Sequence, residues 1–151
     1  MDSMPGQILW LPRDEVRRAA SWFASEGWRV FVLPDGLRDG QGFLSALTVG
    51  GLPLDPPMSQ LRVWHALLDS IRGGVQDLRE VRVAIVWPES GTMRRRSPVD
   101  FDEVIHILGD IAGHAPEWSL NRAPLDLRVV ISHTEIDASA IPIGKIRRRP
   151  R

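Results

Sequence analysis

The most informative stretch of the chain is Val-Arg-Val-Ala-Ile-Val-Trp, at residues 81–87. Its last five residues are all apolar, and the run ends at Pro88. A continuous apolar run that is bounded by turn residues is typical of a strand buried on both faces, as in a parallel sheet. We therefore expect residues 81–87 to form a strand that is covered on both sides.

Around this strand, the pattern of apolar residues predicts two more strands and four helices. Pro12 and Gly27 mark the start and the end of a first helix, because proline suits the first helical turn and glycine suits a C-cap. The remaining predicted elements are a strand at 28–33, helices at 41–49 and 59–71, a helix from about 98 to 113, and a last strand at 125–132. Strands that alternate with helices predict right-handed crossovers and a small parallel sheet with helices packed on it.

The predicted helix at 59–71 has the clearest periodicity of the four. Its apolar stripe is Leu61, Trp64, Leu68 and Ile71, a spacing that is typical of a helix with one buried face. The preceding residues 52–58 contain three prolines and are expected to form a loop, because proline fixes φ and removes a backbone donor. Gly73-Gly74 is expected to stop the helix. Residues 88–98 and 114–124 are also expected to be loops.

Composition excludes several kinds of protein. Of the 151 residues, 43% are hydrophobic and 25% are charged, which is an ordinary globular balance. The formal net charge is zero, which argues against a dedicated nucleic-acid binder. The chain has no cysteine, so disulfides, thiolate nucleophiles and cysteine-based zinc sites are excluded. We find no signal peptide and no apolar stretch near the ~20 residues of a membrane span, so we expect a cytoplasmic protein.

No motif in the sequence indicates catalysis or a cofactor. The four histidines are His65, His106, His114 and His133, and none has the spacing of a zinc motif. Asp102 and His106 are four residues apart and could hold a metal as a pair, but two ligands do not make a site. There is no nucleophile elbow, no P-loop and no Gly-x-Gly-x-x-Gly motif. We therefore expect a binding protein without cofactor or metal, and not an enzyme.

Several motifs follow one another in an order that resembles the barstar family of ribonuclease inhibitors. The first predicted strand ends at Asp35-Gly36, where the family has a similar turn, and Leu52-Pro53 matches a Leu-Pro or Phe-Pro of the family. Residues 64–71, Trp-His-Ala-Leu-Leu-Asp-Ser-Ile, resemble the helix motif Trp/Leu-Asp-Ala-Leu-x-Asp-Cys-Leu. The closing strand at 127–132 resembles the family's Ile-x-Ile-Leu-Ser strand.

The resemblance implies an α/β fold and a division of the chain. The expected fold is a barstar-like, three-stranded parallel sheet flanked by helices, with one extra N-terminal helix. The division is an N-terminal helical extension at 1–27, a barstar-like domain at 28–132 and a flexible basic tail at 133–151. We expect the free protein to be a monomer.

The resemblance also implies a partner and a surface. In the family, acidic residues on the motif helix and the loop before it fill the basic active site of a ribonuclease. Carried over residue by residue, the partner-binding set of this chain is Met58, Ser59, Arg62, His65, Asp69, Asp102 and Glu103. Asp69 matches the second acid of the helix motif, and Asp102 or Glu103 falls near a further acidic contact.

This sequence departs from the family pattern on the proposed surface. His65 stands where the first acid is expected, and the family's aromatic pair, glycine and asparagine before the helix are absent. Arg62 and His65 would be repelled by a basic cleft if both were charged. His65 and Asp69 could instead form an ordinary solvated helix pair, worth about 0.3 kcal/mol.

Three hypotheses about function therefore stay open. The first is an immunity-type inhibitor of a ribonuclease-like toxin or nuclease. The second is a barstar-fold module that binds another protein without inhibiting a nuclease. The third is an accessory nucleic-acid binder that uses the arginine runs at 94–96 and 147–149, although short runs of this kind are more often solvated loop and tail charges.

Overall fold

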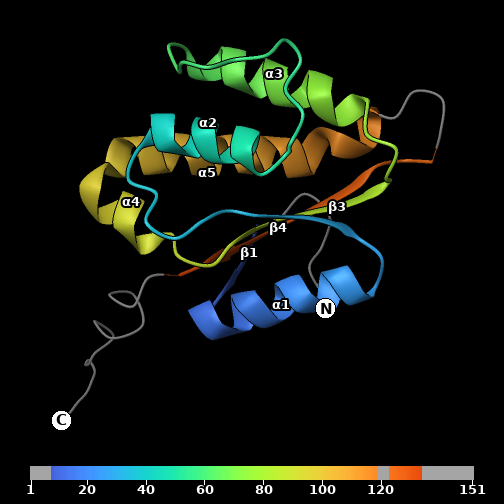
Figure 1. Ribbon diagram of the computed structural model, residues 1–151, viewed down its shortest axis with the longest axis horizontal. Coiled ribbons are helices and arrows are strands. Elements are labelled where there is room, and N and C mark those ends of the chain that lie inside the picture. The colour runs from blue at the N-terminus through green and yellow to red at the C-terminus, as the bar shows by residue number, and fades with distance from the viewer. Residues whose placement is uncertain (1–7, 119–122, 134–151) are drawn as a thin grey trace.

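A sheet of four parallel strands forms the centre of the molecule (Figure 1). The computed structural model describes residues 8–118 and 123–133 of the chain. Within these residues the strands are β1 (Ile8–Leu11), β2 (Arg29–Val32), β3 (Arg82–Trp87) and β4 (Asp126–Ser132). They lie in the order β1-β4-β3-β2, and every pairing is parallel. The predicted α/β class and the parallel sheet flanked by helices are confirmed, whereas the predicted count of three strands was wrong.

The strand that the sequence did not predict is β1. Its four residues, Ile-Leu-Trp-Leu, show no alternation between apolar and polar side chains. The strand is defined instead by its partner β4, with Ile8 opposite Val129 and Leu11 opposite Ser132. The segment that we expected as a helical extension at 1–27 thus supplies, in its described part, an edge strand of the same sheet.

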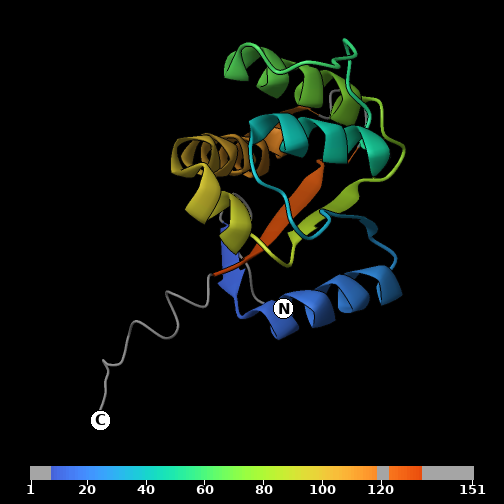
Figure 2. The same cartoon turned by 60° about the vertical axis from the view of Figure 1, so that its left-hand side comes forward.

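One helix, α1 (Arg13–Ser25), covers one face of the sheet (Figure 2). Its buried residues Val16, Ala19 and Phe23 recur at helical spacing, so they lie on the side that faces the strands. Together with Ala84, Val86 and Val130 they form a small apolar cluster. The first predicted helix is therefore present and belongs to the sheet's core.

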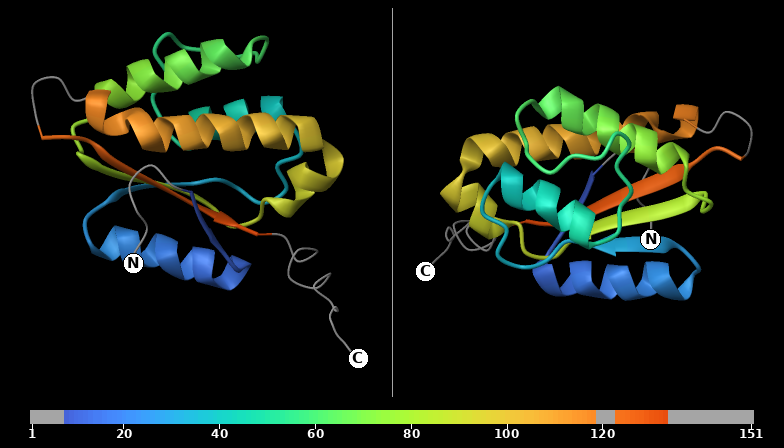
Figure 3. Two further views of the ribbon diagram at one scale, coloured as in Figure 1. Left: turned by 180° about the vertical axis from the view of Figure 1, so that it is seen from behind. Right: turned by 45° about the horizontal axis from the view of Figure 1, so that its top comes forward.

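The other face of the sheet is covered by two layers of helices. The helices α2 (Gly40–Val49) and α5 (Pro98–His114) lie next to the strands, and α3 (Trp64–Gln76) lies on the outside of them (Figure 3). The short helix α4 (Gly91–Arg96) precedes α5, and the 3-10 helix η1 (Ala115–Trp118) follows it. Within residues 8–118 and 123–133, no helix combines the length and the apolar character that a membrane span requires.

The strand β3 confirms that residues 83–87 are buried on both faces of the sheet. Val83, Ile85 and Trp87 belong to the large cluster under α2, α3 and α5, while Ala84 and Val86 belong to the small cluster under α1. All five residues are at most 1% exposed. Their alternation between the two clusters places this strand inside both cores.

The helix α3 begins later and ends later than the sequence predicts. The segment before it is held against α2 by the Gln41 side chain, which donates to the Ser59 carbonyl at 3.0 Å and accepts from the Leu61 backbone N–H at 2.7 Å. Gly73 and Gly74 do not stop the helix. They lie within it. Glycine is required at both positions because a Cβ at either one would collide with backbone atoms of residues 53–55.

The predicted loop at 88–98 contains α4, which a buried acid holds in place. Glu89 is 8% exposed, and its carboxylate accepts hydrogen bonds from the backbone N–H groups of Thr92 and Gly36, both at 3.0 Å. Gly36 has φ +83°, a left-handed conformation that favours glycine, so the predicted Asp35-Gly36 turn is confirmed. One carboxylate thus links the start of α4 to the turn after β2.

Candidate functional site

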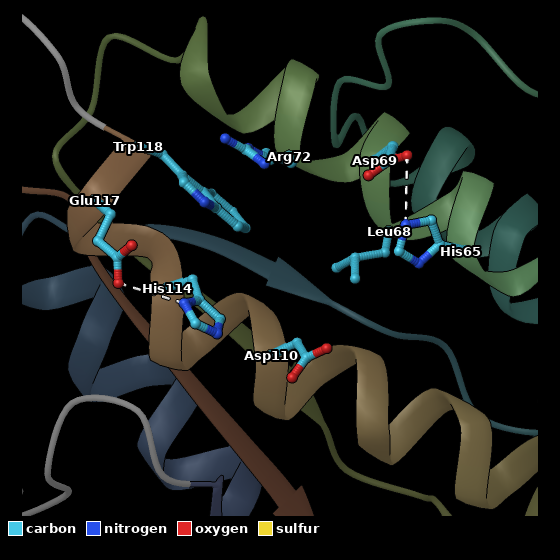
Figure 4. Close-up of a pocket in the computed structure, with 8 residues that line it drawn as sticks. All are labelled: His65, Leu68, Asp69, Arg72, Asp110, His114, Glu117 and Trp118. Atoms are coloured by element: carbon cyan, nitrogen blue, oxygen red, sulfur yellow. Dashed lines mark hydrogen bonds and ion pairs between the residues drawn. The ribbon is translucent and has the colours of Figure 1, made fainter.

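A groove lies between the outer side of α3 and the C-terminal half of α5 with η1 (Figure 4). Its volume is ≈ 400 Å³. The lining side chains are mostly polar or charged, and they come from both sides: His65, Leu68, Asp69, Arg72, Asp110, His114, Glu117 and Trp118. The groove therefore combines residues that are far apart in the sequence.

The wall formed by α3 follows from how this helix packs. Its buried residues are Leu67, Ser70, Ile71, Gly74 and Val75. The predicted stripe of Leu61, Trp64, Leu68 and Ile71 was therefore offset, since Leu68 and Trp64 are only partly buried at the edge of the large cluster. Residues 65, 68, 69 and 72 consequently share the opposite side of the helix and face the groove.

The opposite wall is built by α5 and η1. Asp110 and His114 are four residues apart on α5, so their side chains lie on one face. Trp118 is 7% exposed and presents its ring toward Arg72, whose guanidinium carbon lies 5.9 Å from the ring centroid. This separation is within the range of a cation–π contact between the two walls.

Three histidines lie beside carboxylates around the groove. The His65 Nε2 atom is 3.9 Å from Asp69 Oδ2, and the His114 Nδ1 atom is 3.3 Å from Glu117 Oε2. His106 does not line the groove, but its Nε2 atom is 3.7 Å from Oδ2 of Asp110, which does. The three imidazoles are 80%, 60% and 76% exposed, so these pairs are solvated and contribute little to folding.

The charged groups make the groove acidic when its histidines are neutral. Three carboxylates and one guanidinium line it, which gives a formal charge of −2. The apolar groups Leu68 and Trp118 lie between these charges (Figure 4). An apolar centre with charged margins suits a protruding basic side chain of another protein.

Three of the predicted partner-binding residues, Met58 and Ser59 from the loop and Arg62 from the predicted helix, precede α3 and lie outside this groove. Met58 is partly buried and packs against the large cluster. The Ser59 carbonyl accepts from Gln41, and the exposed Arg62 donates to Gln60 Oε1 at 2.8 Å. Of the predicted partner-binding residues, only His65 and Asp69 line the groove.

The two acids predicted from the last helix also lie elsewhere. Asp102 and Glu103 are in the first turns of α5 and do not line the groove, whereas Asp110 does. Asp110 lies two helical turns after Glu103, so it shares that side of the helix. The spacing of Asp110 and His114 was a detectable signal. Residues 114–124 were interpreted as a loop, so no sequence pattern pointed to Glu117 or Trp118 as site residues.

The histidine pairs do not amount to a metal site. Across residues 8–118 and 123–133, no group of three or more histidine, aspartate or glutamate side chains could hold a metal ion. His106 is paired with Asp110 and not with Asp102.

A second hollow, of ≈ 370 Å³, lies beside β2 and α2 and has a different character. Its lining has no charged side chain: Val32, Pro34, Leu37, Gly42, Ser45, Ala46, Val49 and Gly50. Val32 and Val49 are 52% and 88% exposed, and β2 is an edge strand of the described sheet. This hollow offers apolar contact but no directional polar group.

Comparison with known proteins gives no relative for this chain. No family model matches it, and neither a curated protein nor a solved structure does so.

Proposed function

We propose that this protein is an immunity-type inhibitor that binds a ribonuclease-like toxin or nuclease and blocks its active site. The observation that carries the proposal is the convergence of Asp69, Asp110 and Glu117 on one exposed groove. A ribonuclease active site is basic because it binds phosphates, so it would be complementary to these carboxylates. Complementary charges of this kind accelerate association and provide specificity.

The order of elements supports the same proposal. From β2 to β4 the chain runs through a strand, two helices, a strand, three helical segments and a strand, and the resemblance to barstar was based on the same order with a single helix between the last two strands. Asp69, the acid of the motif helix, is 61% exposed on the groove side of α3. It is therefore available to a partner without a change in the fold.

A second candidate is a barstar-fold module that binds another protein and inhibits no nuclease. The observation in its favour is the positive charge on the same surface. Arg72 lies inside the groove, Arg62 is exposed just before α3, and His65 stands where the resemblance predicts an acid. A partner with both acidic and basic groups would suit this arrangement better than a uniformly basic cleft.

Nucleic-acid binding has less support. Arg94, Arg95 and Arg96 end the short helix α4, and the Arg94 guanidinium carbon lies 5.8 Å from the centre of the Phe101 ring. The second arginine run, at 147–149, lies outside the described residues. Replacing Arg94–Arg96 by glutamine and deleting residues 145–151 should abolish any salt-sensitive binding to RNA if this third hypothesis holds.

The experiment that tests the inhibitor proposal compares the wild type with Asp69→Arg. Each tagged protein is used to purify partners from the native host, and the ribonuclease activity of any bound nuclease is measured with and without an excess of inhibitor. Reversing a charge at the centre of an interface costs about 2–5 kcal/mol, so inhibition should weaken by at least about thirtyfold.

The matched control is Glu26→Arg, which makes the same charge reversal at the exposed end of α1, on the other side of the sheet. It should inhibit as the wild type does. A nuclease that keeps full activity with excess wild type contradicts the inhibitor proposal. A non-nuclease partner that binds the wild type but not Asp69→Arg supports the second candidate.

A further inference from the structure

The edge of the sheet formed by β2 combines an open strand with the apolar hollow beside it. β2 is the last strand in the order β1-β4-β3-β2, so in the described sheet its outer side has no strand next to it. Val32 belongs to this strand and also lines the hollow, together with Val49 of α2. The two valines are 52% and 88% exposed, and none of the residues that line the hollow is charged. Edge and hollow therefore form one exposed, uncharged surface.

One hydrogen bond shows which backbone groups of β2 point away from the sheet. The Leu33 N–H donates to the Val86 carbonyl at 2.8 Å, so Leu33 turns its backbone groups toward β3. Successive residues of a strand turn these groups to opposite sides, so those of Phe31 also face β3, whereas those of Val30 and Val32 face outward. The backbone of β2 thus supplies the directional polar groups that the side chains of the hollow lack.

β2 lacks the features that keep an edge strand from pairing with another chain. Natural edge strands are protected by charged side chains, prolines, bulges or a covering segment. The one charged residue of β2 is Arg29, whose guanidinium carbon lies 4.9 Å from the centre of the Phe31 ring, so its charge lies over the face of the sheet. Pro34 has no N–H to donate, but it follows the end of the strand. The edge is therefore open to pairing from Val30 to Val32.

A second copy of the same strand fits this edge in one register. Two antiparallel β2 strands related by a two-fold axis at Phe31 place Val30 of each copy opposite Val32 of the other, so every outward-facing N–H and C=O of both strands has a partner. An axis at Val32 would instead place Val30 opposite Pro34, which has no N–H. An axis at Val30 would place Val32 opposite Trp28, whose N–H already donates to the Phe23 carbonyl at 3.0 Å.

The charges around the edge also allow two copies to meet. In the register centred on Phe31, the two Arg29 residues are four positions apart, or about 13 Å along the strands. This separation exceeds the screening length of about 10 Å at ordinary salt concentrations, so the two arginines repel each other little. The hollow carries no charge on either copy, so its surface can face its own copy without repulsion.

We propose that two copies of this chain form a dimer by antiparallel pairing of their β2 strands, which joins two four-stranded sheets into one. The exposed valines and the hollow beside each β2 are covered in this dimer. The interface shares no residue with the groove between α3 and α5, so the inference goes beyond the proposed function. It also departs from the expectation that the free protein is a monomer.

The test measures the mass of the full chain in solution and the exchange of its edge amides. Analytical ultracentrifugation from about 5 μM to about 1 mM should show a reversible shift from 16.9 kDa to twice this mass. Because the paired strand is short, we expect a dissociation constant on the order of tens of micromolar. Hydrogen exchange followed by NMR should show that the Val30 and Val32 amides become protected as the protein concentration rises.

Two variants identify the surface, and a third is their control. Val32→Pro removes an N–H that faces outward and leaves the bonds to β3 in place, so the dimer should weaken by about tenfold or more. Val49→Arg places a charge beside each hollow and should also weaken the dimer by about tenfold or more. Val99→Arg makes the same change at a valine of α5 that is 75% exposed and does not line the hollow, so it should dimerise as the wild type does. Circular dichroism checks that each variant is folded.

Three outcomes would overturn the inference. The first is a wild type that stays monomeric at every concentration, and the second is a dimer that persists in Val49→Arg or in a folded Val32→Pro. The third is a monomer whose Val30 and Val32 amides are protected at every concentration, which would show that another segment of the same chain occupies the edge. Failure of the inhibitor proposal is read separately, because Asp69→Arg should dimerise as the wild type does whether or not any nuclease is inhibited.

Discussion

The two sides of α3 differ in almost every respect. On the inner side, Leu67, Ile71 and Val75 have no exposed surface, and the backbone of residues 53–55 packs closely against two glycines. On the outer side, His65 and Asp69 are 80% and 61% exposed and their ring and carboxylate are only loosely paired. The inner side thus fixes where the helix lies, while the outer side presents exposed charges to solvent.

This difference separates folding from binding on a single helix. Apolar burial contributes about 25 cal/mol per Å², so the inner side determines how stably α3 is held. Exposed ion pairs contribute at most about 1 kcal/mol. Charge substitutions on the outer side should therefore change the free energy of unfolding only slightly. Mutations on the two sides should therefore have effects of different size and kind.

The largest contrast is expected between two adjacent leucines. Leu67→Ala removes a fully buried side chain from the large cluster and should lower the free energy of unfolding by about 2–5 kcal/mol. Leu68→Ala truncates a partly buried side chain at the groove and should lower it by about 1 kcal/mol. Urea unfolding followed by tryptophan fluorescence measures both. Equal losses would contradict the division of α3 into two sides.

A smaller effect is expected from two glycines within helices. Gly74→Ala places a methyl group against the backbone of Pro53 and Leu54, so the crowding should lower the unfolding free energy by about 1–3 kcal/mol. Gly109→Ala in α5 meets no atom within 4 Å and should raise it by about 0.5–1 kcal/mol, because alanine favours the helix. Thermal unfolding of both variants is the measurement. An increase for both would show that the loop at 53–55 is not seated on α3.

The smallest effect on stability is expected from Asp69→Asn. The exposed pair with His65 contributes little, so the unfolding free energy should change by less than about 0.5 kcal/mol. The same variant should lose affinity for a basic partner, as proposed above. A large loss of stability in chemical denaturation would mean that Asp69 supports the fold and is not reserved for binding.

The sequence predicted the strands best where burial dominates. Residues 83–87 form an unbroken apolar run, and the predicted strand at 81–87 contains the whole of β3. The strand β1 was missed because four apolar residues give no period, and only its pairing with β4 defines it. The end of α3 was missed because Gly73-Gly74 resembles a stop signal, whereas the glycines are required by the backbone that packs on them.

The residues predicted from the sequence include only two that line the groove, His65 and Asp69, and both lie on α3. His65 and Asp69 are four residues apart, so their meeting on α3 follows from helical geometry. The other wall depends on how α5 lies against α3, which a single sequence pattern does not specify. Asp102 and Glu103 were selected from the family resemblance, Asp110 was not considered, and Trp118 was assigned to a loop. The tertiary packing of α5 and η1 against α3 determines which residues line this wall of the groove.

The order β1-β4-β3-β2 also constrains how the chain can be assembled as it leaves the ribosome. In the described sheet, β1 has β4 as its partner, so β1 cannot pair until the chain has been synthesised as far as β4. Contacts between such distant segments form slowly, because a long loop must close before the pairing is gained. Until then, the apolar Ile-Leu-Trp-Leu segment has no strand to pair with, and a chaperone could bind it.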